Sequence, residues 1–270
     1  MRLLERAALW FLLLAAPAAT LVAVVLSLRD GDEAPVPRPE PSPTIVARTP
    51  LDVCRTLLEL PSSPGERVFA PIYIQRREAN GIAIVATAAV DPAALDVAAE
   101  TIERMFANND LEVPLAEAGA YVIVLADGQT PLDTAEFACL GDEGLGLADV
   151  CGVADTAGFP FVTVHELDLL GDRAGPCRGL NVLYHELGHL VQDWALADAD
   201  HFEARLLYSD AIRAGLYRGE YASRNFREYF AEGTQAFFAS TDVLGTRNRD
   251  WLRSYDPALY ELLVRVYGEE

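Results

Sequence analysis

Two histidines and a glutamate at a fixed spacing are the residues of this chain best suited to chemistry. His185, Glu186 and His189 form the pattern His-Glu-x-x-His, and the whole chain has only 4 histidines. Residues four apart lie on one face of a helix, so both imidazoles can bind one metal ion while Glu186 stands beside the open position of the metal. The pattern therefore predicts the metal site of a zinc hydrolase.

The residues around this pattern predict the helix that it needs. Apolar side chains recur at steps of three and four and form one stripe: Leu183, Leu187, Leu190, Val191 and Trp194. The stripe leaves His185 and His189 on the other side. We therefore expect one buried face that fixes the helix and a separate face that carries the chemistry.

Zinc needs a third protein ligand, and the metzincin pattern does not supply it. That pattern requires a glycine at position 192, a histidine at 195 and a methionine turn. The chain has Gln192 and Ala195 instead, and its only methionines are Met1 and Met105. We therefore look for the third ligand further along the chain.

Glu228 and Glu232 are the candidates, because they are four residues apart and project from one side of a predicted helix. An aromatic side of the same helix is formed by Phe226, Tyr229, Phe230 and Phe237. One carboxylate could bind the metal while the other holds a ligand histidine by its second ring nitrogen. Asn225 with Glu228 also fits a helix capping box, which is the structural alternative. His201 and His165 are the next candidates for a ligand.

The expected chemistry is hydrolysis. Zinc held by two neutral imidazoles and one carboxylate keeps a position for water, lowers the pKa of that water to about 7 and polarises a carbonyl group. Glu186 would take the proton of the water and pass it to the leaving amine. A phenol such as Tyr221 is a suitable donor to the oxyanion, and nearby alternatives are Tyr208, Tyr217 and Tyr229.

The motif His-Glu-x-x-His, followed by Tyr221-x6-Glu228-x3-Glu232 with aromatic residues after the first glutamate, resembles a known family. It is similar to the metallopeptidase domain of anthrax lethal factor and the related Pro-Pro endopeptidases, over about the last ninety residues. The resemblance implies zinc ligands His185, His189 and Glu228, Glu186 as the base, and Tyr221 as the oxyanion donor. Glu232 matches the second glutamate, which would lie behind a ligand. Nothing corresponds to the partner-binding domains of a toxin.

The N-terminal residues 1–30 predict a signal-anchor or transmembrane segment. An uncharged run of 22 residues, 7–28, follows Arg2 and Arg6 and is long enough to cross a bilayer. The preceding arginines place the N-terminus in the cytoplasm and the remainder outside it. Ala-Pro-Ala around Pro17 leaves cleavage and secretion open.

Residues 31–50 are rich in proline and predict an extended linker. The remaining residues, 51–270, are enough for one metallopeptidase domain. We expect an α+β, zincin-like fold, with strands at 81–90 and 120–125 and a helix from Asp91-Pro92 to about Phe106. A third strand, Phe159 to Val164, is our candidate for the edge strand that pairs with substrate.

Charge and cysteine content limit the partners and the compartment. The net charge is −20 and every basic residue is arginine, which disfavours nucleic acid and anionic lipid. The 4 cysteines suit a compartment that permits disulfides and allow three pairings. We favour Cys139 with Cys151 and Cys54 with Cys177.

The sequence thus predicts a membrane-anchored zinc endopeptidase that binds one zinc ion per chain and acts on peptide or protein substrates outside the cytoplasm. Two alternatives stay open. One is a zinc-stabilised binding domain without turnover, and the other is a metal-dependent hydrolase of non-peptide amides.

Overall fold

A five-stranded mixed sheet lies at the centre of the fold in the computed structural model, which describes residues 67–140, 150–154, 159–239 and 247–269. The strand order is β1-β2-β3-β5-β4. The strands are β1 (Gln75–Ala79), β2 (Ile82–Ala86), β3 (Tyr121–Leu125), β4 (Gly152–Ala154) and β5 (Phe161–His165). Strands β2, β3 and β5 are parallel, and β1 and β4 run antiparallel to them at the two edges.

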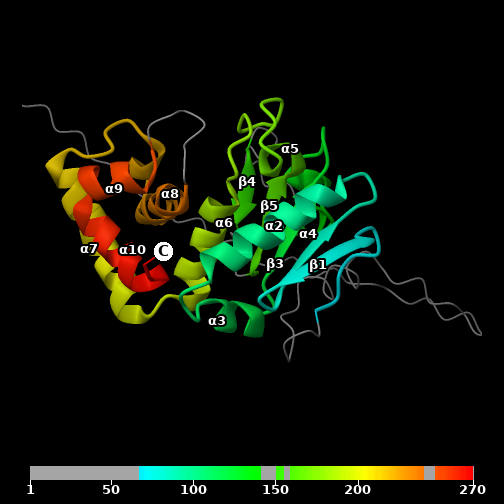
Figure 1. Cartoon of the computed structure of the whole chain (residues 1–270), viewed down its shortest axis with the longest axis horizontal. Helices are drawn as coiled ribbons and strands as arrows, with labels where there is room; N and C mark the ends of the chain where they lie inside the picture. Colours follow the sequence, from blue (N-terminus) through cyan, green and yellow to red (C-terminus); the bar gives the residue numbers. More distant parts are fainter. Residues whose placement is uncertain (1–66, 141–149, 155–158, 240–246, 270) are drawn as a thin grey trace, which may run out of the picture. The chain divides into compact units, whose positions relative to one another are not determined.

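The described helices connect the later strands of the sheet and follow its last strand (Figure 1). They are α2 (Pro92–Met105), α3 (Glu112–Glu117), α4 (Ala135–Leu140), α5 (Glu166–Leu169), α6 (Leu183–Leu190), α7 (Asp198–Ala214), α8 (Phe226–Phe238), α9 (Arg249–Tyr255) and α10 (Pro257–Tyr267). Single turns of 3-10 helix are η1 (Pro131–Asp133) and η4 (Tyr221–Ser223), and a π-helical turn, η3 (Val191–Ala195), extends α6. The α+β class is therefore confirmed.

Local signals placed α2 correctly. Asp91 is its N-cap, and the side chain accepts a hydrogen bond of 2.9 Å from the backbone N–H of Ala93. Pro92 opens the helix, where its missing N–H costs no intrahelical hydrogen bond. The helix ends at Met105, one residue before the predicted end.

Both faces of the sheet are buried, because alternate residues of the strands point to opposite sides. Val122 and Val124 of β3 belong to the larger core, which includes residues of α2, α6, α8 and α10. Tyr121 and Ile123 belong to the smaller core, together with Phe137 of α4. This double burial explains why β3 is apolar throughout.

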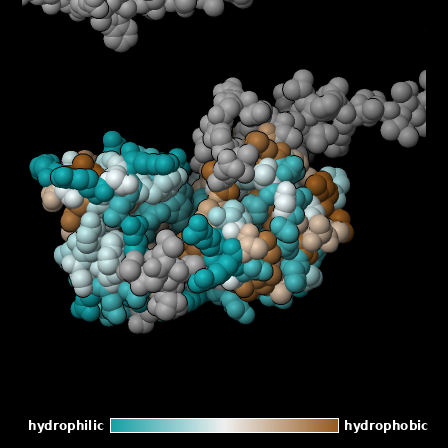
Figure 2. Space-filling view, turned by 90° about the horizontal axis from the view of Figure 1, so that it is seen from above, coloured by the Kyte–Doolittle hydropathy of each residue, from teal (hydrophilic) through white to brown (hydrophobic). Residues whose placement is uncertain are grey.

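The motif helix α6 lies between the sheet and the helices that follow it (Figure 1). It contacts β4 and β5 on one side and α8 on another. Helix α8 in turn packs against α7, α9 and α10. In Figure 2, hydrophilic residues dominate the side of the molecule formed by these later helices, in keeping with the net charge of −20.

The third predicted strand, Phe159 to Val164, is present, but the prediction that it lies at the edge of the sheet is wrong. Residues Phe161–His165 form β5, which is an inner strand because β4 pairs with it on the side away from β3. The edge next to α6 is β4, Gly152–Ala154. With 3 residues, β4 is too short to show the alternation by which a strand is recognised in sequence.

The favoured disulfide pairing is also wrong. Cys151 is bonded to Cys177, with a Cα–Cα distance of 5.4 Å. This bond joins the start of β4 to the loop before α6. The same loop is held by buried Asp168, whose carboxylate accepts hydrogen bonds from the backbone N–H groups of Cys177 and Gly179 at 3.0 Å and 2.9 Å. The side chains of Cys54 and Cys139 are outside the described part of the chain.

The predicted anchor at 7–28 and the linker at 31–50 also lie outside the described residues, and both stay predictions. Within the described ranges, no helix is both long and apolar enough to cross a membrane.

Candidate metal centre

Close packing of α6 against α8 brings the predicted metal ligands together. Gly188 lies at the contact, where an added Cβ atom would meet the Cα atom of Ala231 and the side chain of Thr234 at 3.2 Å. Such a distance is tight for any side chain, so glycine allows the two helices to approach closely. The Glu228 side chain can therefore reach the histidines of α6.

Asn225 begins α8 in the register that this contact needs. Its side chain accepts hydrogen bonds from the backbone N–H groups of Arg227 and Glu228, at 2.9 Å and 3.0 Å. Asn225 is thus the predicted cap, whereas the Glu228 carboxylate faces the histidines. The capping interpretation and the metal-ligand interpretation of this segment are therefore compatible. Asn225 caps the helix, and the Glu228 side chain remains available for a metal.

His185, His189 and Glu228 form a group that could hold a metal ion, with one donor atom of each within 4.8 Å of the others. The Oε2 atom of Glu228 lies 3.2 Å from Nε2 of His185 and 3.4 Å from Nε2 of His189. This oxygen is buried and has no hydrogen bond of normal geometry among the described residues. A buried carboxylate oxygen beside two imidazole nitrogens is a suitable place for a cation, because the ion would satisfy all three atoms.

The charges of the site also favour a cation. Burial raises the pKa of Glu228, but His185 and His189 outweigh this effect and lower it to about 2. Burial lowers the pKa of His185, but Glu228, Glu186 and Glu232 outweigh it and raise that pKa. The carboxylates around His185 therefore create a negative potential that a bound cation would neutralise.

Glu232 lies behind His185, one of the two histidines that face Glu228. Its Oε1 atom is 3.5 Å from Nδ1 of His185, on the far side of the ring from the Nε2 atom that faces Glu228. Its Oε2 atom is 3.6 Å from Arg247, which also pairs with Glu220 at 2.8 Å. A carboxylate in this position orients the imidazole and favours the proton on Nδ1, which leaves Nε2 free to bind a metal.

The edge strand β4 fixes Glu186. The backbone N–H of Ala154 donates a hydrogen bond to the Glu186 carboxylate. A Cβ atom on Gly152 would lie 2.8 Å from Oε1 of Glu186, so the carboxylate rests directly against that glycine. Burial raises the pKa of Glu186, and the neighbouring imidazoles of His185 and His189 oppose this shift. The result is a buried carboxylate of increased basicity, as general-base chemistry requires.

The tertiary structure distinguishes Tyr221 from the other candidate tyrosines. The hydroxyl groups of Tyr217 and Tyr229 both donate to buried Asp256, at 3.2 Å and 2.7 Å. Tyr208 donates to the backbone oxygen of Ser223 at 2.9 Å. Tyr221 is 43% exposed and lines the same cavity as His185, with the two ring centroids 6.1 Å apart. Burial and then Glu228 raise the pKa of Tyr221, so the phenol is a neutral donor.

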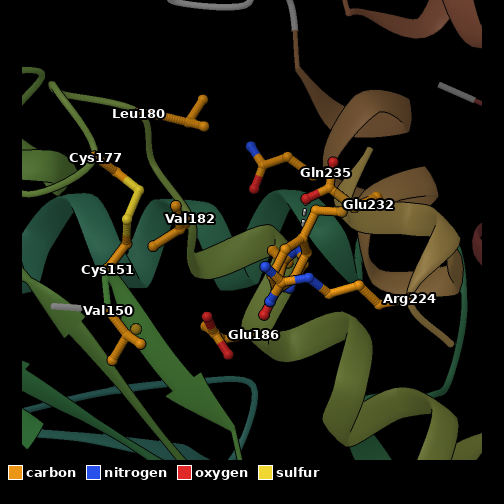
Figure 3. A pocket seen from close by; sticks show the side chains of 12 residues that line it. Val150, Cys151, Cys177, Leu180, Val182, Glu186, Arg224, Glu232 and Gln235 are labelled. Atoms are coloured by element: carbon orange, nitrogen blue, oxygen red, sulfur yellow. Dashed lines mark ion pairs between the residues drawn. A yellow bond between two sulfur atoms is a disulfide. The ribbon is translucent and has the colours of Figure 1, made fainter. Parts of the chain in front are cut away.

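A cavity of about 430 Å³ opens beside these residues (Figure 3). One wall is apolar and is formed by Val150, the disulfide Cys151–Cys177, Leu180 and Val182. The opposite wall is formed by Arg224, which directly follows η4, and by Glu232 and Gln235 of α8 (Figure 3). Tyr221 of η4 also lines the cavity. Glu186 lies between the walls (Figure 3), and His185 also lines the cavity. The site can therefore hold a metal, a buried base and a phenol donor around one accessible space.

His165 and His201 are not in the metal-binding group. His165 is buried at the end of β5, and the ring of His201 packs against Phe226 with centroids 5.5 Å apart. The sequence analysis missed Gly152, Arg224 and the disulfide wall. Arg224 follows Tyr221 by three residues, but neither that spacing nor a lone glycine is a recognisable signal.

No protein-family model, no curated protein and no solved structure matches this chain.

Proposed function

We propose that the chain is a zinc-dependent endopeptidase of the zincin type, related to the lethal factor and Pro-Pro endopeptidase family that its motifs resemble. The observation that carries the proposal is the grouping of His185, His189 and Glu228 beside buried Glu186 on an accessible cavity. Two imidazoles and one carboxylate are a donor set that suits catalytic zinc. Zinc, when bound, supplies a Lewis acid that activates water and polarises the substrate carbonyl.

The residues of the chain supply the remaining steps. Glu186 accepts a proton from the attacking water and delivers it to the leaving amine nitrogen, so one side chain acts as base and then as acid. Tyr221 donates a hydrogen bond to the carbonyl oxygen as negative charge develops on it. Glu232 keeps His185 in the orientation and tautomer that bind a metal.

A peptide is the substrate that the cavity fits best. Among the described strands, β4 pairs only with β5, and an extended peptide can add to such an edge through its backbone. Glu186 contacts Gly152 and Ala154 of this same strand. A substrate strand paired with β4 would thus run past the base and the metal ligands.

Digestion of a broad peptide library by the purified full chain tests this function. We expect internal cleavage that requires zinc, stops with a chelator and returns when zinc is restored. Mass spectrometry of the products measures it. A zinc-loaded chain that cleaves no peptide would favour a binding domain without turnover, and cleavage of non-peptide amides alone would favour the amidohydrolase alternative.

Gly152→Ala is expected to lower the rate of peptide cleavage by about 10²-fold, because displacement of a catalytic group by about 1 Å has an effect of that order. The new Cβ atom would lie 2.8 Å from Oε1 of Glu186 and 2.6 Å from the backbone oxygen of Thr163. Zinc content should not change, because Gly152 is not in the metal-binding group. Rates and bound zinc are measured on the same samples.

Gly128→Ala is the control for loss of stability. Gly128 has φ +76° and no atom within 4 Å of an added Cβ, so alanine there strains the backbone away from the cavity. The Gly128→Ala variant should keep full peptidase activity. Full activity in Gly152→Ala as well would show that β4 does not position Glu186.

We place the domain outside the cytoplasm as part of the same proposal. The disulfide Cys151–Cys177 supports this location, as does the predicted anchor at 7–28. Thiol labelling of protein from its native compartment, before and after reduction, is the test, and reactive thiols at Cys151 and Cys177 without reduction would contradict it.

A further inference from the structure

Arg224 directly follows η4, and its side chain extends into the cavity (Figure 3). Its guanidinium carbon lies 4.2 Å from the centroid of the Tyr221 ring, so the positive charge lies over the aromatic face. Among the residues that the structure describes, no carboxylate forms an ion pair with Arg224. The described contact of this cation in the cavity is with Tyr221.

Tyr221 has few other contacts that could fix its side chain. Tyr217 and Tyr229 are buried and are held by Asp256, whereas Tyr221 is half exposed and its described ring contacts are with His185 and Arg224. An exposed tyrosine loses conformational entropy when it is held in one orientation. A stacked guanidinium reduces this freedom, since its planar group covers one face of the ring.

The charge of Arg224 also affects the hydroxyl group of Tyr221. Arginine has only donors, so Arg224 cannot accept the hydroxyl proton of Tyr221. That proton is left to donate to a substrate oxygen in the cavity. The positive charge of Arg224, which acts to lower the pKa of Tyr221, strengthens the donation.

We propose that Arg224 is a positioning residue that holds Tyr221 against the cavity and orients its hydroxyl group as a donor to the substrate carbonyl oxygen. This inference rests on the proposed peptidase function. It goes beyond that function because it assigns a role to a residue outside the metal-binding motifs, and because the role is exerted through another side chain.

A double-mutant cycle tests whether Arg224 acts through Tyr221. Tyr221→Phe should lower kcat by about 10²–10³-fold, since one oxyanion donor is lost. Arg224→Ala should lower kcat by about 10-fold with little change in KM, and Arg224→Lys should recover part of the loss. The double variant should be no slower than Tyr221→Phe alone, because residues that act as a unit are not additive.

Arg205→Ala is the matched control. Arg205 is exposed and covers the ring of Phe226 at 5.1 Å, so it makes the same kind of contact outside the cavity. Its removal should leave kcat and KM unchanged. Losses that multiply in the double variant of Tyr221 and Arg224 would overturn the inference, even if wild type is an active peptidase.

A second measurement does not depend on activity. In protein labelled with ¹³C at the ζ carbon of tyrosine, the NMR signal of Tyr221 is identified by its absence in Tyr221→Phe. Arg224→Ala and Arg224→Gln should both shift this signal, and Arg205→Ala should not. An unshifted signal in both Arg224 variants would contradict the inference, whether or not the protein cleaves any peptide.

Discussion

Glu186→Gln is expected to keep the fold and the bound zinc but to lose peptide hydrolysis by more than about 10²–10⁴-fold, the usual contribution of a general base. Glutamine has nearly the same size, and its carbonyl oxygen can still accept the hydrogen bond from Ala154. It cannot accept a proton from water. The further loss arises because the amide cannot orient the attacking water in the same way.

The measurement compares initial rates at equal zinc content, with melting temperatures as a check on the fold. Tyr221→Phe is the graded comparison, since it removes one donor and leaves the base, and it should lose about 10²–10³-fold. Cleavage by Glu186→Gln at the wild-type rate would show that this mechanism is wrong. A smaller loss than that of Tyr221→Phe would indicate another base.

Glu228→Ala is expected to release zinc and with it all zinc-dependent hydrolysis. The substitution removes one of the three side chains of the metal-binding group and leaves two histidines without the carboxylate that lies 3.2 Å and 3.4 Å from their Nε2 atoms. His185→Ala and His189→Ala should act in the same way. Zinc affinity, measured by competition with a chromogenic chelator, is the readout.

Two nearby glutamates provide the controls. Glu232→Ala removes the carboxylate behind His185 and should weaken zinc binding by about 10–100-fold, which is less than the loss of a direct ligand. Glu220→Ala removes the carboxylate that pairs with Arg247 at 2.8 Å, which is not in the metal-binding group, and the variant should bind zinc normally. Full zinc occupancy in Glu228→Ala would reject Glu228 as the third ligand.

The features that follow from local patterns could be read from the sequence. The apolar stripe predicted the helix of His185 and His189, and Asp91-Pro92 predicted the start of α2. Helical periodicity and caps involve residues within four positions of one another, so the surrounding fold adds little to them. The grouping of Glu228 with the two histidines was also expected, but only through a resemblance of motifs, and the residues alone left Glu232 open.

Tertiary packing decided which side chains meet at the cavity. Tyr221 was the predicted donor, but the residues alone left Tyr208, Tyr217 and Tyr229 as alternatives. In the structure the hydroxyl groups of Tyr217 and Tyr229 are bonded to buried Asp256 and that of Tyr208 to Ser223, which separates them from Tyr221. The disulfide partner of Cys151 and the edge position of β4 depend in the same way on segments far apart in the chain.

The sequence by itself therefore determined the residues able to do chemistry and the helices that carry them. The structure alone decided how those helices meet a sheet edge, with Gly152 against Glu186 and Arg224 against Tyr221. The physical reason is that residue spacing sets the direction of side chains around one helix, whereas contacts between distant segments depend on how apolar faces pack together and bury their surface.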